Sequence, residues 1–158
     1  MHATYHPYFK GLLEKCGYYD IFLIDSETGD IIYTAFKESD FGSNLMNGPY
    51  ADTNIARLCT EVNNTDGHNL VKMIDFEPYA PSSFEPASFI AAPIYDGFNK
   101  AGVLVLQIPI AQINNIMTER AGLGETGETY LVGSDKFMRS DSRFSDQRTI
   151  LVNKIDTE

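Results

Sequence analysis

Apolar residues recur at helical spacing in three segments of the chain. Residues 7–16 begin with a proline, which suits a first turn, and then place aromatic, leucine and cysteine side chains on one face. A second apolar face runs over residues 54–62, after Asp52 and Thr53, either of which can cap a helix. Residues 111–121 show the same spacing. The pattern therefore predicts three helices.

Runs of β-branched and aromatic residues predict the strands. The runs cover residues 18–25, 31–37, 71–76, 88–96 and 101–110. Residues 26–30 form a turn between the first two runs, and short connections of this kind indicate antiparallel pairing. We interpret residues 77–87 as an extended, proline-rich loop, because a residue before proline disfavours helix. Pro93 predicts an edge, a bend or a bulge in its strand.

The order of these elements predicts an α+β domain. A five-stranded antiparallel sheet with its helices on one face is the architecture that the short connections favour, as in PAS-like or profilin-like domains. After residue 121 the chain changes character and becomes rich in glycine, serine and charge. Within this tail, residues 129–133 and 149–155 are predicted as short strands.

Composition narrows the possible functions. The chain has 158 residues, 43% of them hydrophobic, which is enough to bury a core. Its net charge of -10 repels phosphate backbones, so we expect no nucleic-acid partner and no polybasic membrane patch. No apolar run approaches the ~20 residues of a spanning helix, and the N-terminus has no signal-peptide pattern. We expect a soluble chain, or a soluble piece of a larger membrane protein.

The sequence contains no motif typical of a catalytic site or a metal site. Cys16 and Cys59 match no metal-ligand spacing, and we interpret both as small buried hydrophobes, with a single disulfide as the alternative. Glycines 122, 124 and 127 lack the lysine of a phosphate-binding loop. No nucleophile, base and orienting group can be assembled. We therefore predict no catalytic residues, no metal and no cofactor, and a protein that is not an enzyme.

Several tyrosines and two charged residues lie on strands or loops that border one side of the predicted sheet. Tyrosine suits a ligand pocket because its ring is apolar while its hydroxyl both donates and accepts. A lysine there can pair with a ligand carboxylate, and an aspartate with an amine. The candidate ligand-binding residues are Tyr33, Lys37, Tyr50, Asp75, Tyr79, Phe89 and Tyr95. In the alternative interpretation, the tyrosines close the core and the charged residues are solvated or cap a loop.

Four segments together resemble the extracytoplasmic Cache-type (PAS-like) sensor modules of bacterial chemoreceptors, histidine kinases and nucleotide cyclases. The segments are residues 6–50, 75–96, 102–117 and 122–144. The last is the most specific, with the sequence GETGETYLVG followed by Met138, Arg139 and Ser140. In such receptors this stretch is similar to the opening strand pair of a second, membrane-proximal module.

The resemblance implies a fold and a role. Residues 1–121 would form a Cache sensor module with a long N-terminal helix, and residues 122–158 the start of a second module or a C-terminal extension. The parent would be anchored in the inner membrane, with this part in the periplasm and a possible homodimer through the N-terminal helix. A small metabolite such as a carboxylate, an amino acid or an amine would bind beneath the loop after the second strand and rearrange the helices. The alternatives are a dimerisation or partner-binding module of the same receptor class, and a small enzyme on a profilin-like fold.

Overall fold

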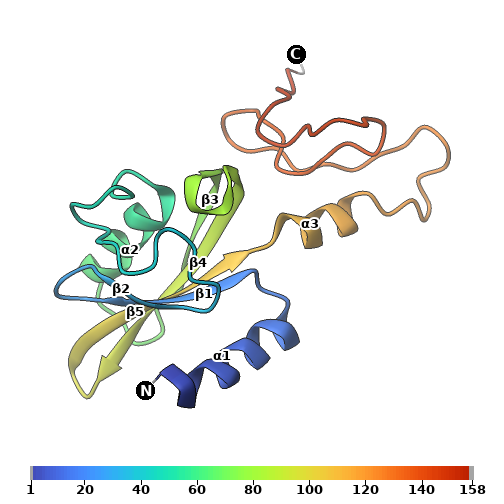
Figure 1. Ribbon diagram of the computed structural model, residues 1–158. Coiled ribbons are helices and arrows are strands. Elements are labelled where there is room, and N and C mark those ends of the chain that lie inside the picture. Colours follow the sequence, from blue (N-terminus) through green and yellow to red (C-terminus); the bar gives the residue numbers. More distant parts are fainter. Residues whose placement is uncertain (1, 157–158) are drawn as a thin grey trace. The chain divides into compact units, whose positions relative to one another are not determined.

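The computed structural model describes residues 2–156, with side chains from residue 4 onward. Two compact units divide the chain between Ile108 and Pro109. Within the described residues, the first unit contains one antiparallel sheet of five strands in the order β2-β1-β5-β4-β3 (Figure 1). The predicted α+β class and the five-stranded antiparallel sheet are therefore confirmed.

The first hairpin joins β1 (Asp20–Asp25) to β2 (Ile31–Thr34), as the two runs of β-branched and aromatic residues around a turn predict. Asp25 makes the turn, because its Oδ1 atom accepts the backbone N–H groups of Glu27 and Thr28. β2 is shorter than the predicted segment. Its pairing with β1 also shifts by one residue, which leaves Ile32 59% exposed.

The predicted proline-rich loop over residues 77–87 is wrong. β3 (Lys72–Tyr79) and β4 (Glu85–Asp96) both run into it, and a single 3-10 turn, η1 (Ala80–Ser82), belongs to their connection. Pro78 pairs with Pro86 across the two strands. Both prolines are tolerated because β3 is an edge strand and the β4–β5 pairing begins only at Ser88, so neither lies between two paired strands.

The second hairpin joins β4 to β5 (Asn99–Ile108). β4 lies between two strands in the sheet order, yet its pairing with β3 ends at Ala91, so Pro93 has a neighbouring strand on one side only. The register shifts between Ile94 and Tyr95 immediately afterwards. Of the predicted edge, bend or bulge, the structure thus shows an unpaired side at Pro93 and a register shift one residue beyond it.

The helices begin and end close to the predicted positions, with one correction. α2 (Asn54–Asn64) follows Thr53 as N-cap residue, and α3 (Ile110–Met117) is shorter than predicted. α1 (His2–Cys16) begins before Pro7 rather than at it. Pro7 therefore lies inside the helix, where it cannot donate to the carbonyl of Ala3 and its ring crowds that carbonyl, yet α1 continues to Cys16.

The sheet is covered on both faces, which corrects the expectation that the helices share one face. On one face, α2 packs over a large apolar core that includes Phe22, Leu58 and Phe89. On the other, α1 packs through a smaller cluster of Leu13, Ile21 and Tyr33 (Figure 1). Alternation of side chains along β1 sends successive residues to these two clusters.

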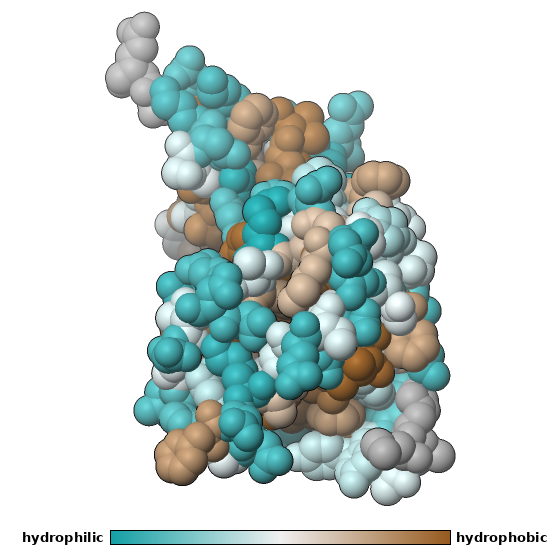
Figure 2. Space-filling model, turned by 90° about the vertical axis from the view of Figure 1, so that its left-hand side faces the viewer, coloured by the Kyte–Doolittle hydropathy of each residue, from teal (hydrophilic) through white to brown (hydrophobic). Residues whose placement is uncertain are grey.

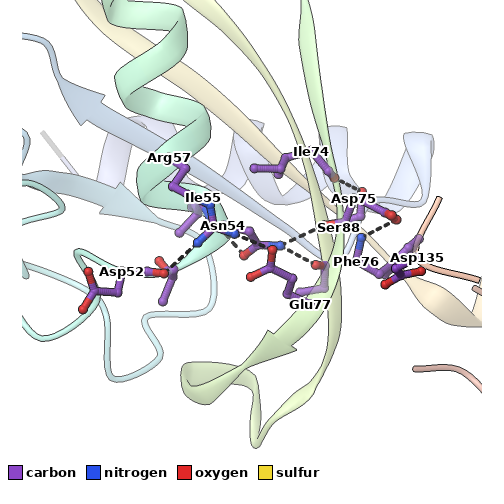
Figure 3. A network of polar contacts seen from close by, with 12 residues as sticks. Asp52, Asn54, Ile55, Arg57, Ile74, Asp75, Phe76, Glu77, Ser88 and Asp135 are labelled. Carbon is purple, nitrogen blue, oxygen red and sulfur yellow. Dashed lines mark hydrogen bonds and ion pairs between the residues drawn. The ribbon is translucent and has the colours of Figure 1, made fainter. Parts of the chain in front are cut away.

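Asn54 ties the start of α2 to the sheet at an irregular point (Figure 3). The β3–β4 register shifts between Ile74 and Glu77, which interrupts the regular ladder there. The Asn54 Nδ2 atom donates to the carbonyl of Asp75 at 3.1 Å and to that of Ala87 at 2.8 Å. The buried amide thus supplies a donor to a carbonyl of each strand, one of them within the irregular stretch.

The second unit contains α3 and the glycine-rich tail. Asp141 organises it: its Oδ1 atom accepts the N–H groups of Thr149 and Ile150, and its Oδ2 atom accepts the side-chain amide of Asn114 in α3. The strands predicted over residues 129–133 and 149–155 do not form. Their places hold isolated bridges, because the backbone groups bond to side chains and turns instead.

Both cysteines carry free thiols, in different surroundings. Cys59 is buried as expected, whereas Cys16 is exposed, because α1 turns Leu13 rather than Cys16 toward the sheet. No helix among residues 2–156 is long and apolar enough to cross a membrane. The face of the molecule in Figure 2 is mainly hydrophilic, with apolar residues in separate small areas.

Candidate functional site

The face of the sheet beneath α2 changes from polar to apolar along two neighbouring strands. On this face, Asp20 in β1 lies opposite Gln107 in β5, at one end of the pairing. Ile24 lies opposite Val103 at the other end, about 13 Å away at the usual rise of a strand. Both Asp20 and Gln107 are buried, which is costly unless they are paired. The polar end is therefore the first place to look for a function.

Asp20 directs the chain over this end of the sheet. Its Oδ1 atom accepts the backbone N–H groups of Ile21 and Ala35, and its Oδ2 atom accepts the hydroxyl of Thr34. Burial raises the pKa of the Asp20 carboxyl, and these donors oppose that shift. The contacts end β2 and begin the connection of residues 35–53, which we call the covering loop.

Asp40, in the covering loop, lies fully buried against Tyr79 from β3. The Tyr79 hydroxyl donates to Asp40 Oδ2 at 2.6 Å, whereas Asp40 Oδ1 has no hydrogen-bond partner within the described part of the chain. Burial raises the pKa of the Asp40 carboxyl, and the nearby Glu38 carboxylate raises it further. Burial and Asp40 also raise the pKa of Tyr79, so its hydroxyl keeps its proton.

Glu38 connects this pair to the polar end of the sheet. Its two oxygen atoms accept the hydroxyls of Tyr19 and Ser82, each at 2.8 Å. Ser82 in turn accepts a bond from the side-chain amide of Gln107 at 3.3 Å, while Gln107 Oε1 has no partner among residues 4–156. We call Glu38, Asp40, Tyr79, Ser82 and Gln107 the acceptor cluster, because it contains two carboxylates and an amide, and two of their oxygen atoms, Asp40 Oδ1 and Gln107 Oε1, have no donor in the described residues.

Three of the seven predicted ligand-binding residues lie on this face of the sheet. Tyr79 and Phe89 are fully buried and meet edge to face, with ring centroids 5.1 Å apart. Tyr50 packs against the same core and donates from its hydroxyl to Ser39 in the covering loop. The structure therefore brings Tyr50, Tyr79 and Phe89 to the α2 face, with Tyr79 in direct contact with the acceptor cluster.

The other four predicted residues lie elsewhere. Tyr33 lies on the α1 face, where its hydroxyl is 3.0 Å from His6 Nδ1, because the shifted register of β2 turns it away from the α2 face. Lys37 is exposed, with its ammonium 5.6 Å from the ring of Phe41. Asp75 is exposed on β3, and Tyr95 packs its ring on His68 near the β4–β5 turn.

Sequence reasoning missed the carboxylates of the acceptor cluster. Glu38 and Asp40 stand in a turn-rich segment, where such residues usually cap turns. A signal was present in Gln107, which interrupts an otherwise apolar strand. A polar residue on the buried face of a central strand needs a partner, and the loop that covers it is the natural source.

The apolar end of the same face holds a pocket of about 310 Å³. The β1–β2 turn, the covering loop and α2 enclose it, and its floor includes Ile24, Leu45 and Val103. The acceptor cluster and this pocket thus lie at opposite ends of the sheet face that α2 and the covering loop share. Residues 4–156 contain no group of three or more side chains arranged to hold a metal ion.

Comparison with known proteins identifies the fold. No protein family matches the chain by its sequence pattern, and no curated protein matches it. Among solved structures, it is similar to the sensor domain of the V. cholerae histidine kinase DctB, with a TM-score of 0.59 and 16% identity over 87% of this chain and 47% of that one.

Two chemoreceptor domains are similar to the same degree. The ligand-binding domain of Campylobacter jejuni Tlp3, solved with 4-methylisoleucine, has a TM-score of 0.62 and 14% identity over 85% of this chain and 48% of that one. The ligand-binding domain of Pseudomonas fluorescens CtaA, solved with L-serine, has a TM-score of 0.58 and 16% identity over 90% and 56%. The chain spans about half the length of these structures. The predicted PAS-like, Cache-type fold is confirmed.

Proposed function

We propose that this chain is an extracytoplasmic ligand-binding sensor module of a bacterial transmembrane receptor, without catalytic activity of its own. Its fold is that of sensor domains from histidine kinases and chemoreceptors, two of them solved with amino acids or their analogues. The observation that carries the proposal is the buried Asp40 carboxylate, whose Oδ1 atom has no donor in the described residues. An unpaired buried acceptor costs about 1–3 kcal/mol, so a donor supplied from outside the described residues would stabilise the folded state.

The acceptor cluster favours a ligand that carries a protonated amine. Asp40 Oδ1 is fully buried, so the covering loop would have to open before an ammonium group could donate to it and neutralise a carboxyl whose pKa burial has raised. Glu38 and the unpaired Gln107 Oε1 atom add acceptors for a second donor. The Tyr79 hydroxyl, which keeps its proton, orients the Asp40 carboxylate. Of the ligand classes that the sequence left open, an amine or an amino acid therefore fits best.

A thermal-shift screen of the whole chain tests this proposal. Ethanolamine, putrescine and a set of amino acids would be compared with organic acids that lack the amine. A ligand at 100 times its dissociation constant adds about 2.7 kcal/mol to stability, or roughly 5–10 °C for a chain of this size. We expect Asp40→Asn to weaken amine binding by roughly ten-fold to a hundred-fold, because a hydrogen bond to a charged group contributes about 1.5–3 kcal/mol.

Asp52→Asn is the matched control. Asp52 lies at the end of the covering loop with its side chain exposed, so the substitution removes the same charge from the same segment. Equal amine affinity in the Asp40 and Asp52 variants would contradict the proposed site. A screen without any saturable hit would contradict the sensor function itself.

One observation favours the alternative of a partner-binding module. Tyr79 and Phe89 fill the centre of the α2 face and have no exposed area. Such filling is expected of a module that does not enclose a ligand. Such a module would melt at the same temperature in every compound of the screen. It would instead be stabilised by a separate protein from the same compartment.

We further propose that the chain is part of a longer receptor. The similar solved structures are about twice as long as the matched segment, which supports the interpretation of residues 122–158 as the start of a second module after residues 1–121. Anchoring in the inner membrane, a periplasmic location and a homodimer through α1 belong to the same proposal. Protease added outside intact spheroplasts should cleave this part of the receptor, and complete protection there would contradict the location.

A further inference from the structure

The pocket at the apolar end of the α2 face is separate from the acceptor cluster. Its volume of about 310 Å³ is roughly twice that of an engineered apolar cavity that binds benzene, and it falls within the range of ligand pockets. Ala56 and Cys59 of α2 form one wall, and Met46 and Ala51 of the covering loop form another. This partly open space is large enough for a small organic molecule.

The polar groups around this pocket are already bonded within the protein. Three donors converge on Asp25 Oδ1, and the Ser26 hydroxyl donates to the carbonyl of Lys100. The Thr60 hydroxyl donates to the carbonyl of Ala56, and the Asn63 amide donates to that of Ser26. A ligand with many donors or a charge would find few partners here and would lose its hydration.

The remaining wall is uncharged and adaptable. Burial raises the pKa of the Cys59 thiol to about 12, so the thiol stays neutral. Met46 is 54% exposed, and its flexible thioether lies beside Gly29, where a Cβ atom would come within 2.6 Å of Met46 Cγ, so the absence of a side chain leaves room for the methionine. A methionine at the mouth can shift to admit or cover a small molecule.

We propose that this pocket binds a small, uncharged and mainly apolar molecule, at a second site distinct from the acceptor cluster. Contact with Ile24, Leu45, Ala56 and Val103 supplies the affinity. A single polar group on the ligand would point to the mouth, where Asn64 is exposed.

A series of 1-alkanols from butanol to octanol tests the proposal on the whole chain. Affinity, measured by calorimetry, is expected to rise about four-fold for each added methylene until the pocket is full. Ala51→Leu and Ala56→Leu fill the pocket and are expected to abolish this binding. Ala51 is only partly buried, so its variant should fold even if the Ala56 variant does not. Ala121→Leu adds the same side chain at an exposed position and should bind as the wild type does.

The pocket carries its own reporter thiol. With Cys16→Ser removing the exposed thiol, reaction of Cys59 with methylmercury reports access to the pocket wall. Hexanol at ten times its dissociation constant should slow that reaction about eleven-fold, as single-site occupancy requires.

Three results would overturn the proposal: no alkanol binding, equal binding in Ala51→Leu, or an unchanged reaction rate of Cys59. Asp40→Asn separates the two sites, because it should leave alkanol binding unchanged whatever it does to amines.

Discussion

Asn54→Ala is expected to destabilise the protein more than an ordinary surface substitution would. The side chain is 1% exposed, and its Nδ2 atom is the donor to two carbonyls, those of Asp75 in β3 and Ala87 in β4 (Figure 3). Truncation removes both bonds, and each buried acceptor left without a donor costs about 1–3 kcal/mol. Because Asp75 lies on the edge strand and water can replace part of the loss there, we expect a decrease of about 2–4 kcal/mol in the free energy of unfolding.

Urea denaturation followed by circular dichroism measures this change directly, and a thermal melt should fall by roughly 5–15 °C. Asn54→Asp should be worse than Asn54→Ala, because it turns a carboxylate toward two carbonyl oxygens. Asn64→Ala is the control: it removes the same side chain from the exposed end of the same helix and should change stability by under about 0.5 kcal/mol. The reasoning fails if Asn54→Ala is as mild as Asn64→Ala, or if the aspartate is tolerated better than the alanine.

Three further outcomes are expected. Lys100→Met removes an ammonium that donates to three carbonyls at the end of α2 and should cost about 1–2 kcal/mol in urea melts, whereas Lys10→Met on exposed α1 should not. Burial raises the pKa of Asp40 above the ordinary value of 3.8, so the folded state binds the extra proton and stability without ligand should fall as pH rises from 3.8 through the raised pKa. In Asp40→Asn that slope should shrink to the part that Asp20 contributes, because burial raises the pKa of that carboxyl too. Asn114→Ala breaks the paired bonds to Asp141, at 2.7 and 2.8 Å, and should speed proteolysis of residues 122–156 without lowering the melting temperature of the first unit.

The elements that the sequence predicts best are those that local pattern determines. The β1–β2 hairpin follows from two runs of β-branched and aromatic residues on both sides of a turn, in which Asp25 accepts the backbone N–H groups of Glu27 and Thr28. The helix over residues 54–62 follows from its apolar spacing and from Thr53. Both signals lie within a few residues of the element that they specify, so a single sequence is enough to find them.

The errors arise where partner strands decide the outcome. Pro78 and Pro86 look like loop residues until each is seen opposite the other beyond the β4–β5 pairing. Tyr33 reaches the α1 face because β2 slips by one residue against β1, and a slip of one reverses the side that a residue faces. Asp40 becomes a candidate site residue only when the covering loop brings it onto Tyr79, 39 positions along the chain.

The two helices that cover the sheet are held to it unequally, because α2 buries many side chains against its face and α1 buries few. Leu13 is the buried residue of α1 among those whose side chains are described, whereas α2 buries six. Undocking α1 therefore costs on the order of one buried leucine, about 1.5–3 kcal/mol, together with the partial burial of Phe9 in the same cluster. Amide hydrogen exchange would register this difference as early exchange across α1 and late exchange across α2.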